Sequence, residues 1–170
     1  QRKVNEAGAI AEAGRPGETC PNFHHAQWLA GYNNAKVDAM IPTNYISILK
    51  LHEKCSDSLV NEVTGICPRD IEFSTDLFRI RVRKMVNSVL SENHMMKAFV
   101  RLKPQGEKVL FGYMKPTHDI WKMAGTFFAK RFPGTIIVLG NNTKSWISFY
   151  DGKELKHSKG ESLPKTMAEL

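Results

Sequence analysis

The sequence predicts an α+β fold in which a small antiparallel sheet, in the order β-β-α-β-β, occupies the C-terminal half and packs against N-terminal helices. Three observations predict this class. Apolar residues recur every three or four positions between Phe78 and Leu90, which is helical spacing. Short apolar or alternating runs separated by turn residues follow Asn93, as is typical of strands. One helical stripe, from Ile120 to Phe128, lies between these runs.

Length and composition indicate one domain with a loose arm. The chain has 170 residues, of which 42% are hydrophobic and 24% charged, and these are ordinary values for a globular protein. A chain of this size buries roughly two-thirds of its unfolded surface and can fold without a disulfide or a metal. We expect a mobile arm over residues 1–21, a single domain over residues 22–160 and an irregular tail over residues 161–170.

The first expected elements are helices. Residues 22–40 have a weak helical pattern, which Pro42 interrupts. Thr43 or Asn44 can cap a second helix, and Thr64-Gly65 ends that region.

A longer helix and a hairpin are expected next. Asp76, or one of the two residues before it, can cap the helix that contains Phe78 to Leu90. Residues 98–102 and 109–114 then predict two strands, joined by a turn at residues 104–107. These two strands would form the first hairpin of the sheet.

The last third of the chain predicts a helix and three strands. The helix runs from His118 to Arg131, and Gly125 within it predicts close packing against a neighbouring element. Residues 135–139 and 146–150 read as strands. The Asp151-Gly152 pair is a strong hairpin signal, so a last short strand is expected through residue 155.

The positive charge is concentrated in the middle of the chain. The formal net charge is +7. Between Asp76 and Arg131, twelve Lys and Arg stand against four Asp and Glu, a net of +8, so the remaining residues sum to −1. A concentrated basic field attracts polyanions such as nucleic acid, or an acidic protein surface. A solvated basic surface without a specific partner is the competing interpretation.

The candidate nucleic-acid-binding residues lie on faces that the pattern predicts to be exposed. Lys and Arg contacts to phosphate give affinity without sequence information. Trp121 or Trp146 could stack on unpaired bases, although both could equally be buried. Arg131 could instead cap the C-terminal end of its helix, where the helix dipole favours a cation. The candidates are Arg79, Arg83, Lys84, Lys97, Arg101, Lys122, Lys130, Arg131 and Trp121.

Two histidines are the candidates for catalysis. If Thr117 caps the following helix, His118 sits where backbone N–H groups converge and could bind a phosphate or transfer a proton. His94 could approach His118 if the strand at Ala98 lies beside the start of that helix. Two histidines without a nucleophile or a carboxylate pair do not define a reaction. A structural role for His118 is therefore the stronger expectation, and an enzyme the weaker one.

The cysteines give no reason to expect a metal or another cofactor. Cys20-x₃-His24-His25 with Cys55 or Cys67 could supply the four ligands of zinc, but the spacing is not that of a zinc knuckle. The chain begins without Met, as a fragment would, and shows no signal peptide. No apolar run approaches the ~20 residues of a membrane span. We expect reduced thiols, a cytoplasmic location and no membrane partner.

Three segments resemble the family of domains of unknown function called DUF4130, which has no settled activity. The segments are His94-Met95-Met96-Lys97-Ala98-Phe99-Val100-Arg101, Pro116-Thr117-His118-Asp119-Ile120 and Phe127-Phe128-Ala129-Lys130-Arg131-Phe132-Pro133, followed by Trp146 and the Tyr150-Asp151-Gly152 turn. The resemblance covers about Leu77 to Leu155, and it includes the Pro-x-His-Asp pattern of the family at His118.

The resemblance implies a setting in DNA repair or modification. The family occurs fused to uracil-DNA glycosylase-like domains, and beside radical SAM proteins of DNA modification or repair. This sequence has no glycosylase-like region and no Cys-x₃-Cys-x₂-Cys cluster motif, so such an enzyme would be a separate partner chain. We therefore expect a nucleic-acid-binding accessory domain, most plausibly for DNA. A protein-interaction module that docks onto the partner enzyme is the alternative, and an enzyme built on His94 and His118 is a weaker one.

Overall fold

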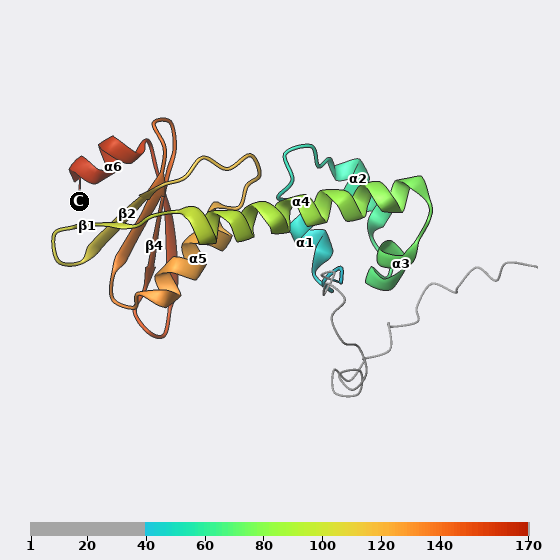
Figure 1. The fold of residues 1–170 in the computed structure, drawn as a ribbon, viewed down its shortest axis with the longest axis horizontal. Coiled ribbons are helices and arrows are strands. Elements are labelled where there is room, and N and C mark those ends of the chain that lie inside the picture. The colour runs from blue at the N-terminus through green and yellow to red at the C-terminus, as the bar shows by residue number, and fades with distance from the viewer. Residues whose placement is uncertain (1–39, 170) are drawn as a thin grey trace, which may run out of the picture. The chain divides into compact units, whose positions relative to one another are not determined.

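The computed structural model of the chain describes residues 40–169. The predicted arm and the predicted helix at residues 22–40 therefore lie almost wholly outside the described residues. Within this range the chain forms helices and one five-stranded sheet (Figure 1), which confirms the α+β class and the helices before the sheet. No helix of residues 40–169 is both long and apolar enough to cross a membrane.

The first core lies among four helices. They are α1 (Tyr45–Leu49), α2 (Asp57–Val63), α3 (Pro68–Phe73) and α4 (Leu77–Phe99). Figure 1 shows α1 to α3 beside the first part of α4, and both α1 and α3 pack against it. Val82, Val86 and Val89 of α4 are fully buried here with apolar residues of the three short helices, and Ile120 joins them from the loop before a later helix, α5 (Trp121–Arg131). The helical spacing of these valines is the pattern that predicted α4.

The start of α4 agrees with the sequence, but its end does not. The Asp76 carboxylate accepts a hydrogen bond from the Arg79 backbone N–H at 3.1 Å, so Asp76 is the cap. The strand predicted at residues 98–102 is wrong, because α4 continues to Phe99. Asn93 and Met96 extend the buried stripe at helical spacing, and this long-range packing outweighs a five-residue alternation.

The five strands lie side by side in sequence order. They are β1 (Lys103–Gln105), β2 (Val109–Tyr113), β3 (Ile136–Gly140), β4 (Ser145–Tyr150) and β5 (Leu155–Gly160). The predicted antiparallel sheet is wrong at one pairing, because β2 and β3 are parallel and the sheet is mixed. The helix α5 (Trp121–Arg131) joins these two strands, and a helical crossover returns the chain to the end at which the previous strand began.

The helix α5 packs closely on one face of the sheet. Gly125 of α5 lies against Ser148 and Trp146 of β4, close enough that a methyl group at residue 125 would overlap the Ser148 hydroxyl. The predicted close packing of Gly125 is thus confirmed. The second core forms between α5 and this face, and it includes Ile137 and Leu139 of β3.

The predicted irregular tail contains a helix instead. This helix, α6 (Leu163–Glu169), buries Leu163 and Thr166. The Thr166 hydroxyl lies 2.7 Å from the Ser145 hydroxyl, and Ser145 alternates with Trp146 along β4, so α6 lies on the face opposite α5. Two buried residues three positions apart were too weak a pattern to predict this short helix.

Candidate nucleic-acid interface

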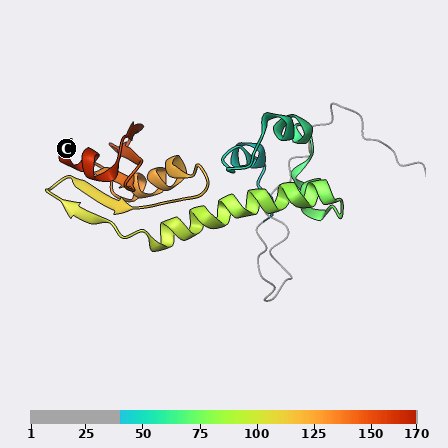
Figure 2. The same ribbon diagram turned by 90° about the horizontal axis from the view of Figure 1, so that it is seen from above.

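The loop that carries His118 is fixed by a carboxylate of α4. This loop runs back alongside α4 before α5 starts (Figure 2). Glu92 accepts hydrogen bonds from the backbone N–H groups of Thr117 and His118, at 2.7 and 2.8 Å. The predicted cap at Thr117 is wrong, because α5 begins only at Trp121 with Ile120 at the cap position. A carboxylate already occupies the two N–H groups that a phosphate would have used.

The side chain of His118 is buried and held on both ring nitrogens. It is 6% exposed. Its Nδ1 accepts a hydrogen bond from the Glu53 backbone N–H at 3.4 Å, and its Nε2 lies 2.8 Å from the Ser88 hydroxyl oxygen. A nitrogen that accepts from a backbone N–H carries no proton, so we assign the proton to Nε2, which then donates to Ser88. A general base that activates Ser88 would need the opposite tautomer.

The neighbour of His118 is a different histidine from the one predicted. The ring of His52 packs on it with 4.3 Å between centroids. Burial is the largest effect that lowers the pKa of His52, and the proximity of His118 lowers it further. His94 is exposed on α4, and the strand that was to bring it to His118 does not exist. The arrangement therefore favours the structural interpretation of His118.

The predicted basic residues on the first part of α4 have unequal roles. Arg83 donates to the backbone carbonyls of Ile71 and Glu72, and this ties α4 to α3. Arg79 is half-buried, whereas Lys84 is exposed. Arg83 is accordingly a structural residue as much as a source of positive charge.

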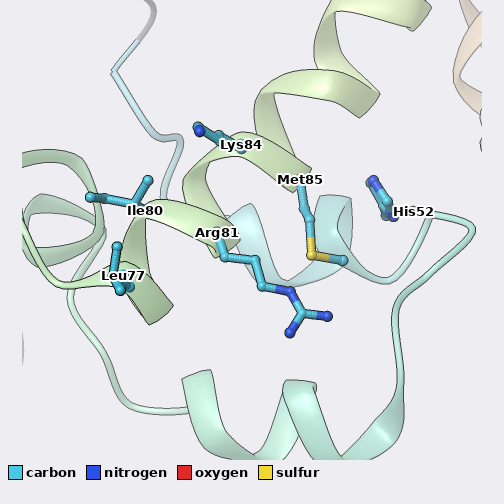
Figure 3. Close-up of a pocket in the computed structure, with 6 residues that line it drawn as sticks. All are labelled: His52, Leu77, Ile80, Arg81, Lys84 and Met85. Atoms are coloured by element: carbon cyan, nitrogen blue, oxygen red, sulfur yellow. The ribbon is translucent and has the colours of Figure 1, made fainter.

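An open groove of about 410 Å³ lies beside this part of α4, and we call it the Arg81 groove. Its lining consists of His52, Leu77, Ile80, Arg81, Lys84 and Met85. Figure 3 shows the Arg81 guanidinium and the Met85 sulfur reaching toward one side, whereas the Lys84 ammonium points away from Arg81. No carboxylate lines this groove, and the lowered pKa of His52 keeps that ring neutral near pH 7.

A second groove of about 260 Å³ lies between the ends of α4 and α5, and we call it the Phe132 groove. Three predicted residues, Lys97, Arg101 and Arg131, meet there. The Lys97 ammonium lies 5.1 Å from the ring centroid of Phe127, and Phe132 is 37% exposed. The rest of the lining is apolar, and it comprises Val100, Leu102 and Phe128.

The basic segment lacks ion pairs in the described structure. The three ion pairs within residues 40–169 are Lys54–Glu53, Lys156–Glu154 and Lys165–Glu161. All three lie outside residues 76–131, so none of the twelve Lys and Arg of that segment is neutralised by a described carboxylate at ion-pair distance. The positive charge of this segment is therefore not balanced by ion pairs within the described residues.

The remaining predicted residues lie outside both grooves. Lys122 and Lys130 are exposed on α5. Trp121 is only 8% exposed and belongs to the core beneath α5, which favours the buried alternative over a stacking role. Trp146 is half-buried, with the Lys159 ammonium 5.4 Å from its ring centroid. Large aromatic side chains bury the most apolar area of any residue, and this favours the core over the surface.

Cysteine and histidine ligands do not assemble in the part of the chain that the structure describes. No three His, Cys, Asp or Glu side chains of residues 40–169 converge as a metal site requires. Cys55 is half-buried, and burial is the main effect that raises the pKa of its thiol. Cys20 and the two histidines after it lie outside the described residues.

Sequence reasoning missed the residues that complete these sites. Phe127 and Phe132 were named only in a helical stripe or in a segment that resembles the family, and neither was predicted to bind nucleic acid, yet both line the groove with Arg131. Glu92 was also missed. One signal could have found it: it is one of four acidic residues in a segment with twelve Lys and Arg, and an isolated carboxylate there has an unusual electrostatic setting.

Comparison with known proteins identifies one family. The model of a family described as a domain of unknown function, DUF4130, matches residues 67–168, which is more than half of the chain. No curated protein and no solved structure matches the chain.

Proposed function

This chain belongs to DUF4130, a family of unknown function, and we propose that it is a nucleic-acid-binding accessory domain that serves DNA repair or modification in the cytoplasm. In this proposal the domain supplies binding and a separate partner enzyme supplies the chemistry. The partner would be of the radical SAM or glycosylase type that the family resemblance implies. No cofactor is required of the domain itself.

The observation that carries the proposal is the unneutralised charge of residues 76–131. Lys97, Arg101 and Arg131 converge on one groove whose lining has no carboxylate. Cations that folding gathers without a nearby carboxylate repel one another, so a fold that gathers them favours binding of a polyanion. Nucleic acid meets this requirement, because each phosphate contact releases condensed counterions and so gains free energy.

The test compares two doubly substituted proteins that carry the same change in charge. Lys97→Glu with Arg131→Glu reverses two cations of the Phe132 groove. Lys144→Glu with Lys50→Glu is the control, because these exposed residues have no described ion pair and lie outside the lining of the Phe132 groove. Arg83 and Arg101 are left intact, since their guanidinium groups also bind backbone carbonyls.

Fluorescence anisotropy with labelled single- and double-stranded DNA at low salt measures the effect. We expect the groove variant to bind at least about tenfold more weakly than the control variant, since two attractive phosphate contacts become repulsive. Equal weakening in both variants would show that the binding comes from the net charge of the protein and not from the Phe132 groove. Absence of binding by the unsubstituted protein would contradict the proposal.

A specific observation favours the alternative of a protein-interaction module. Six apolar side chains form a continuous face on three strands, on the side of the sheet opposite α5. Only Val138 among them is fully buried. The other five are half-buried, and they are Val109, Phe111, Ile136, Ile147 and Phe149. An apolar sheet face that is incompletely covered is typical of a surface that packs on another protein.

The two functions are separable by substitution on this face. Phe149→Lys would place a charge on it while leaving the Phe132 groove unchanged. If the interaction function is correct, an enzyme co-purifies with the unsubstituted protein and not with the Phe149→Lys variant. The purified protein then does not bind DNA. If nucleic-acid binding is the function, DNA affinity is the same in both.

A further inference from the structure

We infer that the Phe132 groove binds an unpaired nucleotide, so that the domain prefers single-stranded nucleic acid to a duplex. This inference rests on the proposed nucleic-acid-binding function and adds the form of the nucleic acid that is recognised. The ligand chemistry is a base with its adjoining phosphate, which DNA and RNA share.

The aromatic lining of the groove points to an unpaired base. Phe127 and Phe132 both line a recess between the ends of two helices, and Phe132 is the more accessible ring. In a duplex both faces of every base are covered by its neighbours in the stack. A ring set in a recess can therefore stack only on a base that has left the duplex or never entered one.

The cations of the groove suit the phosphate of the same nucleotide. The Lys97 ammonium lies over the Phe127 ring, and this contact holds the charge at the groove while covering one face of that ring. Phe132 then remains as the stacking surface. Arg101 and Arg131 line the same groove, and cations beside a stacking ring are the combination found in proteins that bind single strands.

The size of the groove limits what it can hold. At about 260 Å³ it is somewhat smaller than the pockets of ~300–1,000 Å³ that bind drug-sized molecules. One base fits this scale better than a run of stacked bases. The Arg81 groove is larger, but the one ring in its lining, His52, already packs on His118, and its other apolar side chains are aliphatic or thioether. It therefore offers phosphate contacts without a comparable stacking platform.

The experiment uses three labelled DNA probes of equal length. They are a single strand, the duplex of the same sequence, and a single strand whose bases are replaced by abasic sites. The abasic strand keeps every phosphate and loses every base. We expect the intact strand to bind about tenfold more tightly than the abasic strand, which is the effect of one base–aromatic stack, and more tightly than the duplex.

Substitution of Phe132 locates the effect. Phe132→Leu keeps an apolar side chain at the end of α5 and removes the ring, so it should fold and bind intact and abasic strands equally. Phe132→Trp should preserve the difference. Phe99→Ala is the control, because Phe99 is 65% exposed and lies outside the groove lining. An RNA single strand tested in parallel should show the same dependence on Phe132, since it carries the same stacking surfaces.

The outcomes separate this inference from the proposed function. If intact, abasic and duplex probes bind equally and Phe132→Leu changes nothing, the unpaired-nucleotide inference fails while nucleic-acid binding stands. If none of the probes binds at low salt, the proposed function fails, and this inference fails with it. A preference for the intact strand that persists in Phe132→Leu would also overturn the assignment to this groove.

Discussion

At the residue scale, the partners of a side chain decide its role more than its type does. His118 matches a family pattern and lies beside a serine, Ser88, which is also the setting of a catalytic histidine. Its Nδ1 accepts from the Glu53 backbone N–H, and its ring is buried against His52. These contacts join the loop before α5 to the loop after α1 and to α4. We therefore regard His118 as a connector of three segments.

The first prediction concerns the stability contribution of His118. His118→Ala should lower the free energy of unfolding by about 1–3 kcal/mol, because it removes two hydrogen bonds and the packing of a buried ring against His52. Urea denaturation measures this loss. His94→Ala is the matched control, and since His94 is exposed it should change stability by less than ~0.5 kcal/mol. Full stability in His118→Ala would contradict the structural role.

The second prediction concerns pH. Burial, followed by the charge of Lys122, lowers the pKa of His157 below its ordinary value of 6.5. The unfolded chain then binds a proton at a higher pH than the folded chain, so stability is present above pH 6.5 and falls as the pH drops through the folded pKa. The lowered pKa of His52 acts in the same direction.

Urea midpoints measured between about pH 7 and pH 5 should therefore fall with acidification. His157→Gln should make this fall shallower, because it removes one of the two histidines whose pKa the fold lowers. A midpoint that rises on acidification, or a His157→Gln profile that is steeper than the original, would show that the sign is wrong.

The residue types of the site were only partly predictable from sequence. A count of charges located the basic segment, and Lys97, Arg101 and Arg131 came from it. The burial of Trp121 and the exposure of Phe132 depend on where the α5 stripe meets the sheet, and neither a helical period nor composition determines that. The contact between Glu92 and the backbone of residues 117 and 118 joins segments 25 and 26 positions apart, beyond the reach of local patterns.

At the scale of elements, short patterns failed where long-range contacts outweighed them. Residues 98–102 resemble a strand, yet residues 98 and 99 complete α4 because this helix already packs on both cores. The parallel pairing of β2 and β3, in contrast, could have been predicted from the sequence. The predicted order of elements already placed a helix between these strands, and a helical crossover favours a parallel pair.

The third prediction concerns the packing of α5 on the sheet. Gly125→Ala should destabilise the fold by about 1–3 kcal/mol, as overpacking does, because the new methyl group meets the Ser148 hydroxyl, and the Ser148 Cβ lies at 3.3 Å from its position. The Ser148 hydroxyl cannot turn away freely, since it lies 2.9 Å from Nδ1 of His157.

A double-mutant cycle checks the cause. Adding Ser148→Ala to Gly125→Ala should recover part of the loss, so that the two effects are not additive. If Gly125→Ala stabilises the protein, as alanine does in an open helix, the close contact between α5 and β4 is wrong.

At the scale of the described molecule, charge and packing are separated along α4. Its buried stripe contacts both cores, while its basic residues and those of α5 carry no ion pair within residues 40–169. The Arg81 groove and the Phe132 groove lie near opposite ends of this 23-residue helix. A helix of that length spans roughly 35 Å, so a single strand that engaged both grooves would follow the helix for several nucleotides.

The most direct test of the central claim is the salt dependence of binding to a single-stranded oligonucleotide. A plot of the logarithm of the association constant against the logarithm of salt concentration should be linear with a negative slope. Lys97→Gln with Arg131→Gln should reduce the magnitude of that slope by about 1.4, or ~0.7 for each phosphate contact removed. No binding at low salt, or a slope that these substitutions leave unchanged, would contradict the assignment of the Phe132 groove as a phosphate-contacting site.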